Sequence, residues 1–370
     1  MYRYTRKICK KCMLQEDTFH GIVINDEGLC SLCAKSGAAP ARNWDEMQAL
    51  FEGHLAGARG HFPYEGMIMM SGGKDSAYLA HMLKKRYDVN LLAFIIDNNY
   101  EYPETFENAV AIAGKLDMPY VLYRQDPQRM RRYYRFLFCE ESIAQQDCGQ
   151  VCTFCGRFLI RTAAEFARAM NIPLVFSGHN PEQIFLMGES MESDPERLTI
   201  AEFTMAMLEE DTQKATTAWT ESFSESRNGL FPDALAPDGV TLLFPFQHFP
   251  YEPERMMNMV RTELDWRPIK RFSKTYIASG CRLVKLWAYL AHCGGTNNYV
   301  DFEFSSQVRQ GTLSHETVKQ FYSETAAELE ELRELVQDLD MLEPMARLLR
   351  DRFGDDNGLL RLLTGKESGR

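Results

Sequence analysis

The stretch "MIMMSGGKDS", residues 67–76, decides the fold. Its apolar start has the length of a buried strand and runs directly into Ser71, Gly72 and Gly73, and a helical pattern follows over 76–86. A strand that leads through glycines into a helix presents backbone N–H groups and a helix N-terminus to an anion, and glycine lets the backbone approach a phosphate closely. We therefore expect a phosphate-binding turn here, although the stretch does not have the pattern of a Walker loop.

The side chains of the same turn suit a nucleotide. Ser71 and Ser76 supply hydroxyl donors, and Lys74 supplies positive charge. Asp75 is poorly suited to contact with a phosphate, but a carboxylate among phosphate donors can hold Mg²⁺. The alternative interpretation is an ordinary glycine-rich turn between a strand and a helix. The residue types favour a site for a nucleotide with its magnesium ion.

Apolar segments of strand length alternate with helical segments through the middle of the chain. Helices are expected over 76–86, 103–116 and 158–170, with another near Trp44 to Leu55. This alternation predicts an α/β fold with a parallel sheet that helices cover on both faces, and in such sheets ligands bind beyond the carboxyl ends of the strands. The strand segments are "GMIMM", "LLAFIID", "YVLYR" and "IPLVF", and the polar residues at three of their ends are Ser71 to Ser76, Asp97 to Asn99 and Gly178 to Asn180.

Four cysteines organise the N-terminal segment. They form two Cys-x-x-Cys pairs, "CKKC" and "CSLC", with seventeen residues between the pairs. This spacing is typical of a tetrahedral zinc site with four thiolate ligands. Such a shell leaves no open coordination position, so we expect a structural Zn²⁺ that stabilises a module too small to have its own core. The ligands would be Cys9, Cys12, Cys30 and Cys33.

These patterns divide the chain into four expected parts. Residues 1–40 are a zinc ribbon and 41–186 are the nucleotide-binding core. Residues 187–240 turn polar and helical and are expected to form an insertion or lid. Residues 241–370 complete the core and end in a helical region with acidic faces.

Composition limits the classes of function. With 370 residues, 45% of them hydrophobic, the chain can bury a large core. No apolar run reaches the roughly 18 to 20 residues that span a bilayer, and the N-terminus lacks the apolar stretch of a signal peptide, so we expect a cytoplasmic protein without a membrane partner. A net charge of −11 argues against general nucleic-acid binding.

One basic segment, "YRQDPQRMRRYYRF", stands out from this acidic balance. It has two interpretations: a solvated helix face, or a site for phosphate or a nucleotide-bearing substrate. Its arginines are Arg124, Arg129, Arg131, Arg132 and Arg135.

The hexapeptide "SGGKDS" after an apolar strand resembles the PP-loop of the N-type ATP pyrophosphatases, a superfamily with an adenine-nucleotide alpha-hydrolase fold. The resemblance implies cleavage of ATP between its α and β phosphates, adenylation of a carbonyl or amide oxygen, and displacement of AMP by nitrogen or sulfur. Two further segments, "CKKCMLQEDTFHGIVINDEGLCSLC" and "SSQVRQGTLSHETV", are similar to parts of N-acetyl sugar amidotransferase-like proteins of this superfamily.

The resemblance also assigns roles to residues. The loop would hold the phosphates through Ser71, Gly72, Gly73, Lys74 and Ser76. Asp75 with Glu182 would hold Mg²⁺, Asp97 would lie near the ribose or adenine, and Gly178 and Asn180 would line the nucleotide site. His179 is either a general acid/base at the end of its strand or a hydrogen-bonded structural residue.

A second cysteine group stands at "CGQVCTFCGRFLIR". Its pair, Cys152 and Cys155, precedes the helix expected over 158–170, and Cys139 and Cys148 are near in sequence. The pair resembles that of the thiolation branch, whose tRNA thiolases combine it with one distant cysteine; Cys281 is the candidate for that partner. The alternatives are a structural zinc site and buried, inert thiols.

Two forms of sulfur delivery are open for this group. Three thiolates around a [4Fe–4S] cluster would leave one iron with a position for an exogenous sulfide. Alternatively, one cysteine would carry a persulfide, helped by a thiol pKa that a helix N-terminus lowers. In the first form the cysteines are ligands of a cluster, and in the second form one of them carries the transferred sulfur.

The chain also departs from the thiolation pattern. After Gly-His-Asn those enzymes usually carry an acid pair, whereas this chain has Pro181, Glu182 and Gln183. Glu182 can replace the first acid as a magnesium ligand, but Gln183 cannot supply the second charge. The position of a second carboxylate is therefore left open by the sequence.

The leading hypothesis is an ATP-dependent enzyme that replaces a carbonyl oxygen of a small-molecule acceptor with sulfur supplied by a donor such as a cysteine desulfurase. The first alternative is amidation of a sugar with ammonia from a partner glutaminase. The others are thiolation of tRNA and a non-catalytic nucleotide-binding adaptor. The intact "SGGKDS" argues against the adaptor, and the acidic composition argues against tRNA.

Overall fold

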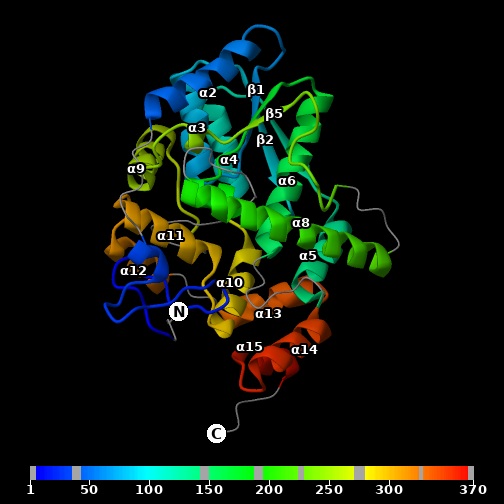
Figure 1. Cartoon of the computed structure of the whole chain (residues 1–370). Coiled ribbons are helices and arrows are strands. Elements are labelled where there is room, and N and C mark those ends of the chain that lie inside the picture. The colour runs from blue at the N-terminus through cyan, green and yellow to red at the C-terminus, as the bar shows by residue number, and fades with distance from the viewer. Residues whose placement is uncertain are drawn as a thin grey trace.

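The computed structural model describes residues 6–35, 43–141, 150–186, 195–223, 229–270, 280–324 and 328–365. A five-stranded sheet lies at its centre (Figure 1). The strand order is β3-β2-β1-β4-β5 and every neighbouring pair is parallel, which confirms the predicted α/β fold. The strands are β1 (Gly66–Met69), β2 (Leu91–Asp97), β3 (Tyr120–Arg124), β4 (Leu174–Phe176) and β5 (Thr241–Leu243).

The central strands are apolar throughout because both of their faces are buried. On one face, Ile68 and Ile95 belong to the main core, together with residues of α2 (Trp44–Ala58), α3 (Lys74–Lys85) and α4 (Pro103–Lys115). On the other face, Met67, Leu92 and Phe94 pack against Ala163 and Ala167 of α6 (Gln150–Ala169). Alternate side chains of each strand thus enter different cores, as a sheet covered on both faces requires.

The start of α6 differs from the prediction. The helix begins at Gln150 rather than at 158, so Cys152 and Cys155 lie inside it and not before it. The apolar pattern extends this far because Val151 and Phe154 are also buried. The pair therefore sits on the first two turns of a long helix.

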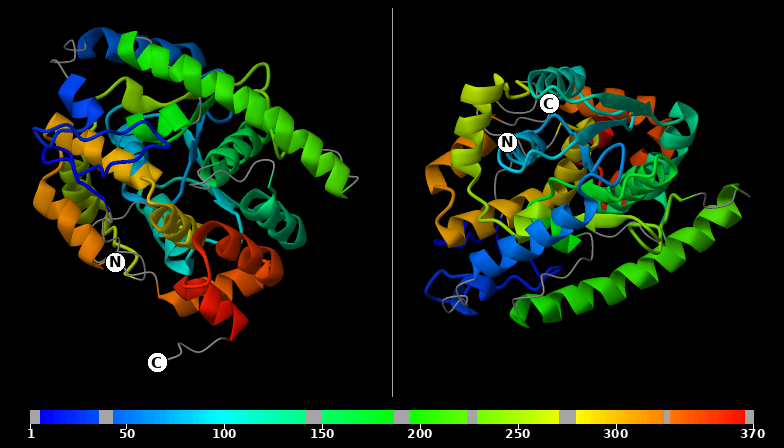
Figure 2. Two further views of the ribbon diagram at one scale, coloured as in Figure 1. Left: turned by 60° about the horizontal axis from the view of Figure 1, so that its bottom comes forward. Right: turned by 90° about the horizontal axis from the view of Figure 1, so that it is seen from above.

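The region after β4 contains one long helix. A short helix, α7 (Pro181–Leu186), precedes α8 (Pro195–Phe223), which crosses the outside of the molecule (Figure 2). Trp219 of α8 is fully buried, and its ring contacts that of Phe136 in α5 (Pro127–Cys139) with centroids 5.2 Å apart. The C-terminal part of this helix is therefore fixed to the core.

The chain from residue 241 onward supplies a strand and seven of the fifteen described α-helices. The segment "TLLFPFQHFP" forms edge strand β5 and a 3₁₀ turn, η1 (Pro245–Gln247), a strand that sequence analysis did not identify. The last three helices pack together at one end of the molecule (Figure 1). The helices are α9 (Pro253–Leu264), α10 (Arg282–Gly294), α11 (Tyr299–Gln310), α12 (His315–Glu324), α13 (Leu329–Asp338), α14 (Leu342–Phe353) and α15 (Gly358–Thr364).

The N-terminal ribbon, which ends in the short helix α1 (Ser31–Lys35), docks on the turn between α10 and α11. Asn297 is fully buried in this turn, and its side-chain amide donates to the Gln15 carbonyl at 3.0 Å and to Asp17 Oδ2 at 3.2 Å. Its side-chain oxygen accepts from the Gln15 N–H at 3.1 Å, and its backbone N–H donates to Asp17 Oδ2 at 2.7 Å. One side chain thus joins residues about 280 positions apart.

In the described part of the chain, no helix is both long enough and apolar enough to cross a membrane.

We predict that Asn297→Ala lowers the free energy of unfolding by about 2 kcal/mol, because it leaves Gln15 and Asp17 with buried polar groups that lack partners. Urea denaturation of the zinc-loaded protein measures this change. Asn258→Ala on the exposed side of α9 is the matched control and is expected to be neutral. Equal stability of the two variants would contradict the role of Asn297 in docking the ribbon.

Candidate functional site

The candidate nucleotide site lies where the strand order reverses. The loop 71–73 follows β1, and residues 177–180 follow its neighbour β4. The two loops touch, because a Cβ atom on Gly178 would lie only 3.0 Å from the backbone nitrogen of Ser76. Ligands of doubly wound sheets bind at this reversal, beyond the carboxyl ends of the strands. The structure therefore brings together the two loops that the sequence singled out.

Gly72 fixes the shape of the loop. Its φ of +68° is in the left-handed region, and a Cβ atom there would lie 2.0 Å from the carbonyl oxygen of Thr105. The Gly72 carbonyl accepts a hydrogen bond from Trp266 Nε1 at 2.9 Å. Only glycine meets both requirements, so the loop is held in one conformation from two sides.

The N-terminus of α3 is open to an anion. Gly73 is its N-cap and provides no side-chain hydrogen bond to the first turn. The hydroxyls of Ser71 and Ser76 lie 3.1 Å apart, and the Ser76 hydroxyl also donates to the Gly73 carbonyl at 3.2 Å. A helix start without a side-chain cap can offer its backbone donors and its dipole to a phosphate.

Lys74 is buried, with 2% of its surface exposed, and its charge is balanced inside the site. Its ammonium group donates to Asp75 Oδ2 at 2.9 Å and to the Tyr251 hydroxyl at 3.0 Å. Tyr251 in turn donates to Asp75 Oδ1 at 2.9 Å. This triangle holds Lys74 and Asp75 in fixed positions beside the loop. Sequence analysis missed Tyr251, whose only signal is its place in the aromatic segment "FPFQHFPYEP".

A second carboxylate reaches the site from α11. Glu303 is 1% exposed, and its side chain accepts hydrogen bonds from Gln183 Nε2 at 3.3 Å and from Gln307 Nε2 at 3.2 Å. Burial raises the pKa of Glu303 to about 7, although nearby Lys74 opposes this shift. Glu303 therefore lies next to Gln183, the residue that this chain has where the thiolation pattern carries its second acid. The signal for it in the sequence is a run of polar residues, Glu303 and Ser305 to Gln307, on the buried side of a helix.

The predicted magnesium ligands lie around this crevice. Glu182 accepts a hydrogen bond from the hydroxyl of Ser306, and the charge of Asp75 acts on Glu303. Among the residues the structure describes, the carboxylate oxygens of Asp75, Glu182 and Glu303 are not all close enough to one another to bind a single ion by themselves. Mg²⁺ in nucleotide sites uses one or two carboxylates and completes its shell with phosphates and water, so the donor set fits the ion.

His179 is held as a neutral imidazole. Its Nδ1 lies 2.5 Å from the hydroxyl of Ser177, and desolvation lowers its pKa to about 4 despite the nearby charge of Asp75. It is therefore uncharged at neutral pH. It can donate or accept one hydrogen bond with a ligand, but it adds no charge.

Asp97 lies at the end of β2. Its carboxylate accepts from the backbone N–H of Asn99 at 2.7 Å and pairs with Arg124 at 3.3 Å, and these two contacts orient it.

The structure brings Cys152, Cys155 and Cys281 together. An antiparallel bridge between Glu101 and Cys281 places the distant cysteine beside the end of β2, and Asn98 Nδ2 donates to Cys281 Sγ at 3.7 Å. The charge of each thiol, when ionised, acts on the others. The fold thus brings Cys281 near two cysteines that lie more than 120 residues earlier in the sequence.

The pKa values of these thiols are raised, not lowered as expected for a persulfide carrier at a helix N-terminus. Desolvation raises the pKa of Cys155 to about 12 and that of Cys152 further, and the carboxyl group of Glu101 adds to both shifts. The pKa of Glu101 itself rises to about 8 by burial. The expectation of an acidified thiol is wrong for the metal-free chain, because the protein around the pair excludes water.

The other cysteines of the core lie outside this group. Cys139 Sγ is 3.9 Å from Met341 Sδ, and Cys293 Sγ accepts from Asn357 Nδ2 at 3.3 Å, both in contacts with the C-terminal helices. Cys148 lies outside the described residues.

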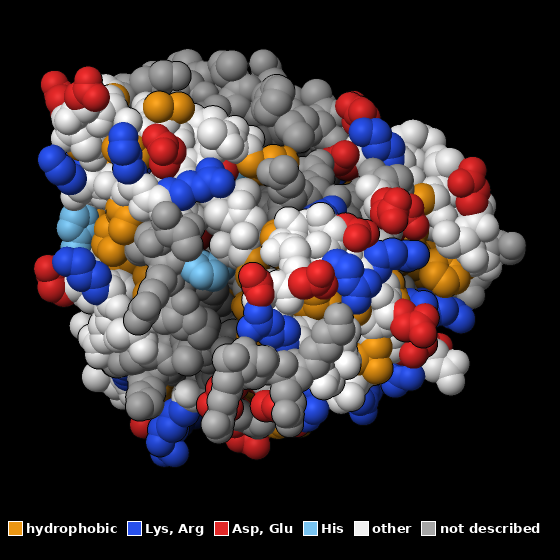
Figure 3. Space-filling view, turned by 90° about the horizontal axis from the view of Figure 1, so that it is seen from below, with side chains coloured by type: hydrophobic (Ala, Val, Ile, Leu, Met, Phe, Trp, Pro, Cys, Tyr) orange, Lys and Arg blue, Asp and Glu red, His pale blue; other side chains and the backbone are white. Residues whose placement is uncertain are grey.

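The basic segment is not a continuous positive surface. Arg124 bonds Asn99 and Asp97, and Arg135 pairs with Asp340 at 2.9 Å. Figure 3 shows acidic and basic side chains interspersed on the described part of the face seen from below.

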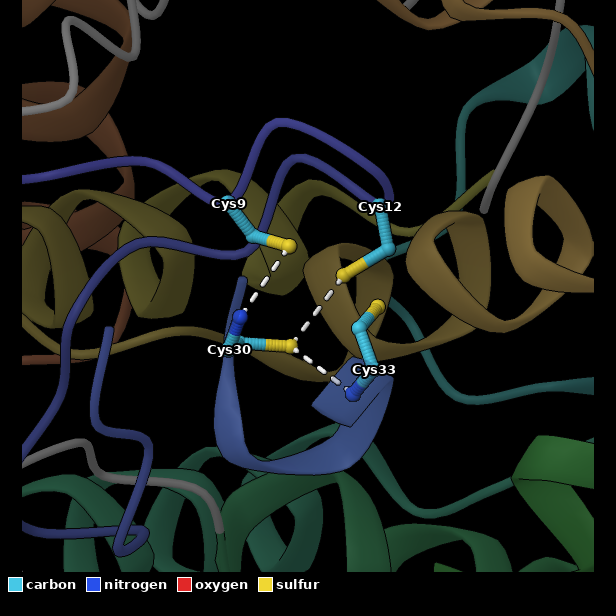
Figure 4. Close-up of side chains that lie close together, drawn as sticks. All are labelled: Cys9, Cys12, Cys30 and Cys33. Atoms are coloured by element: carbon cyan, nitrogen blue, oxygen red, sulfur yellow. Dashed lines mark hydrogen bonds between the residues drawn. The ribbon is translucent and has the colours of Figure 1, made fainter. Parts of the chain in front are cut away.

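The four ribbon cysteines lie close enough together to hold one metal ion (Figure 4). Their sulfur atoms all lie within 4.8 Å of one another, and those of Cys12 and Cys30 are 3.5 Å apart. A tetrahedron with Zn–S bonds of about 2.3 Å needs sulfur separations of about 3.8 Å, so the donor set fits Zn²⁺. Among the described residues this is the one group of three or more potential ligands that is close enough for a single ion. The second cysteine group therefore does not have the geometry of another such zinc site.

Comparisons with known proteins give only distant similarities. No family model matches the chain. An uncharacterized protein of Methanocaldococcus jannaschii is 28% identical over 116 residues, which is 31% of this chain and 38% of that protein. The chain thus matches well under half the length of this relative.

Three solved structures are similar in part. An NH3-dependent NAD synthetase from Campylobacter jejuni is 17% identical (TM-score 0.30; 41% of this chain, 64% of that chain). An NMN synthetase from Francisella tularensis is 12% identical (TM-score 0.36; 74% and 95%). A U34-tRNA thiolase from Methanococcus maripaludis, with its [4Fe–4S] cluster, is 16% identical (TM-score 0.35; 83% and 86%). TM-scores this low do not define a common function, so the proposal below depends on the chain's own geometry.

We predict that Gly72→Ala lowers the free energy of unfolding by roughly 2 to 4 kcal/mol, from the left-handed φ and the collision with Thr105. Gly73→Ala is the matched control, because its φ is −79° and the nearest atom to its Cβ would be 3.4 Å away. Thermal and urea unfolding of both variants measure the difference. Similar losses at the two positions would contradict the described loop conformation.

The raised pKa of Glu303 predicts a pH dependence. Its folded pKa is about 7 and its ordinary value is 4.5, so the stability it contributes is complete below pH 4.5 and is lost as the pH rises to 7. Glu303→Gln removes this loss. The stability of wild type relative to this variant should therefore fall by roughly 3 kcal/mol between pH 4 and pH 8 in protein free of metal and nucleotide. Glu316→Gln, at an exposed position, should show no such trend.

Proposed function

We propose that this chain is an ATP-dependent transferase that adenylates a carbonyl oxygen of a small-molecule acceptor and then replaces that oxygen with sulfur. One observation carries the proposal: Thr105 of α4 touches both halves of the site. Its carbonyl oxygen packs on Gly72 of the phosphate loop, and its Oγ1 would lie 2.4 Å from a Cβ on Gly280, the neighbour of Cys281. The candidate sulfur site is therefore adjacent to the candidate phosphate site.

The first step needs positive charge on the phosphates of ATP. The acceptor's carbonyl oxygen attacks the α-phosphorus, the bond to the bridging oxygen of the β-phosphate breaks, and pyrophosphate leaves. Lys74, the backbone N–H groups at the start of α3 and the hydroxyls of Ser71 and Ser76 are placed to stabilise that leaving group. Mg²⁺ would be held by Asp75 with Glu182 or Glu303 and would neutralise phosphate charge.

The second step exchanges oxygen for sulfur. A sulfur nucleophile adds to the activated carbon, the carbon–oxygen bond breaks, and AMP leaves with the former carbonyl oxygen. Cys152, Cys155 and Cys281 would be the ligands of a [4Fe–4S] cluster, which would supply an iron position for a donated sulfide. Cys281 is buried and Cys152 and Cys155 are half-buried, and this arrangement would limit the access of bulk water to the activated carbon, which would otherwise be hydrolysed. A cysteine desulfurase would supply the sulfur as a persulfide, and a thiol reductant would release it as sulfide by a two-electron reduction.

Metal analysis tests the sulfur route. Protein purified without oxygen should contain about one zinc and roughly four iron with acid-labile sulfide per chain. Cys152→Ala/Cys155→Ala should lose the iron and keep the zinc, and Cys293→Ala, a cysteine outside the group, should keep both.

Two other results have definite meanings. Two zinc ions, one of them lost in the double variant, would make the second cysteine group structural and would refute the sulfur route. Zinc alone, with activity dependent on added ammonia or a glutaminase, would favour amidation instead.

A further inference from the structure

Tyr251 joins the two charged residues at the start of α3. Its hydroxyl accepts a hydrogen bond from the ammonium group of Lys74 at 3.0 Å and donates one to Asp75 Oδ1 at 2.9 Å. Lys74 also donates directly to the other carboxylate oxygen, Asp75 Oδ2, at 2.9 Å. Each oxygen of the carboxylate therefore has its own partner, a neutral hydroxyl on Oδ1 and an ammonium group on Oδ2.

The two charged side chains differ in their access to a ligand. The side chain of Lys74 is 2% exposed, whereas that of Asp75 is 20% exposed and can be reached from the site. Among the described residues, Lys74 and Tyr251 are the hydrogen-bond partners of the Asp75 carboxylate. The orientation of this carboxylate therefore depends on these two side chains.

Aromatic packing fixes Tyr251 against the helix that carries both charges. Tyr251 is buried, and its ring meets that of Phe246 edge to face with centroids 5.2 Å apart. Phe246 in turn stacks on Tyr78 of α3 at 6.4 Å, one helical turn after Lys74. The ammonium group of Lys74 also lies 5.7 Å from the centre of the Tyr251 ring, within the range of a cation–π contact. The hydroxyl therefore has a fixed position relative to the loop.

A magnesium-bound nucleotide would place separate demands on this triangle. Lys74 would turn its ammonium group toward phosphate, and Asp75 would offer an oxygen to Mg²⁺. Both demands compete with the direct bond from Lys74 to Asp75 Oδ2, and its loss leaves that oxygen open. The bond from Tyr251 uses Oδ1, so neither demand competes with it.

We propose that Tyr251 is a positioning residue that prepares the site for the magnesium-bound form of a nucleotide. When Lys74 turns to the phosphates, the Tyr251 hydroxyl keeps the Asp75 carboxylate oriented and leaves Oδ2 available to the ion. Tyr251 acts through Asp75 and needs no contact with the nucleotide. The inference rests on the nucleotide-binding step of the proposed function, and it is independent of the acceptor and of the sulfur route.

Titration calorimetry of the zinc-loaded full chain with AMPCPP, an analogue that cannot be cleaved between its α and β phosphates, tests the proposal. The affinity is measured with excess Mg²⁺ and again in buffer from which a chelating resin has removed divalent ions, so that the ribbon keeps its zinc. Tyr251→Phe removes only the hydroxyl. We expect it to weaken binding about tenfold with Mg²⁺, the effect of one hydrogen bond to a charged group, and less than about threefold without Mg²⁺.

Tyr78→Phe is the matched control. Tyr78 belongs to the same aromatic group, but its hydroxyl has no hydrogen-bond partner among the described residues, so both affinities should stay unchanged. Asp75→Asn tests whether Tyr251 acts through the carboxylate. This variant should lose most of the gain in affinity that Mg²⁺ provides, and adding Tyr251→Phe to it should reduce that gain no further.

The possible results separate this inference from the proposed function. Equal loss of affinity with and without Mg²⁺ in Tyr251→Phe, or an effect on the magnesium-dependent gain that persists in the Asp75→Asn background, would overturn the positioning role. AMPCPP binding that Tyr251→Phe leaves unchanged would also overturn it, while nucleotide binding itself would stand. No AMPCPP binding by the wild type would refute the nucleotide step of the proposed function together with the inference.

Discussion

The ammonium group of Lys74, buried next to the phosphate loop, is the constraint on which the rest of the site depends. A buried cation is tolerated only when it is paired and hydrogen-bonded. Asp75 supplies the paired charge, and Tyr251, from a segment almost 180 residues later, completes the hydrogen bonds. Glu303 adds a second carboxyl group close enough for the Lys74 charge to oppose the rise of its pKa. The C-terminal third therefore contributes residues to the candidate nucleotide site and is not an appendage to the sheet.

Close backbone contact is the second organising feature. Gly72 and Gly280 both lie against Thr105, one at its carbonyl and one at its hydroxyl. Neither position has room for a Cβ atom, so the phosphate loop and the segment before Cys281 converge on the first turn of α4. The distance between the two chemical sites is thus set by packing around one residue.

The zinc ribbon and the core depend on each other. The ribbon cysteines form a small cluster of their own, which a metal can stabilise, but the module is placed by Asn297 in the turn before α11. The same helix carries Glu303 into the candidate nucleotide site. A metal held by the ribbon cysteines would therefore be connected, through one turn, to the position of a carboxylate in the crevice.

The sequence by itself determined the elements that depend on local patterns: the central strands, the glycine turn before α3, the spacing of the zinc ligands and the pairing of Cys152 with Cys155. These follow from periodicity, backbone geometry and ligand spacing over a few residues. Only the tertiary structure decided the contributions of Tyr251, Trp266 and Glu303. It also reversed the expected direction of the thiol pKa shifts. Each of these depends on desolvation and on contacts between distant segments, and a single sequence carries no local signal for either.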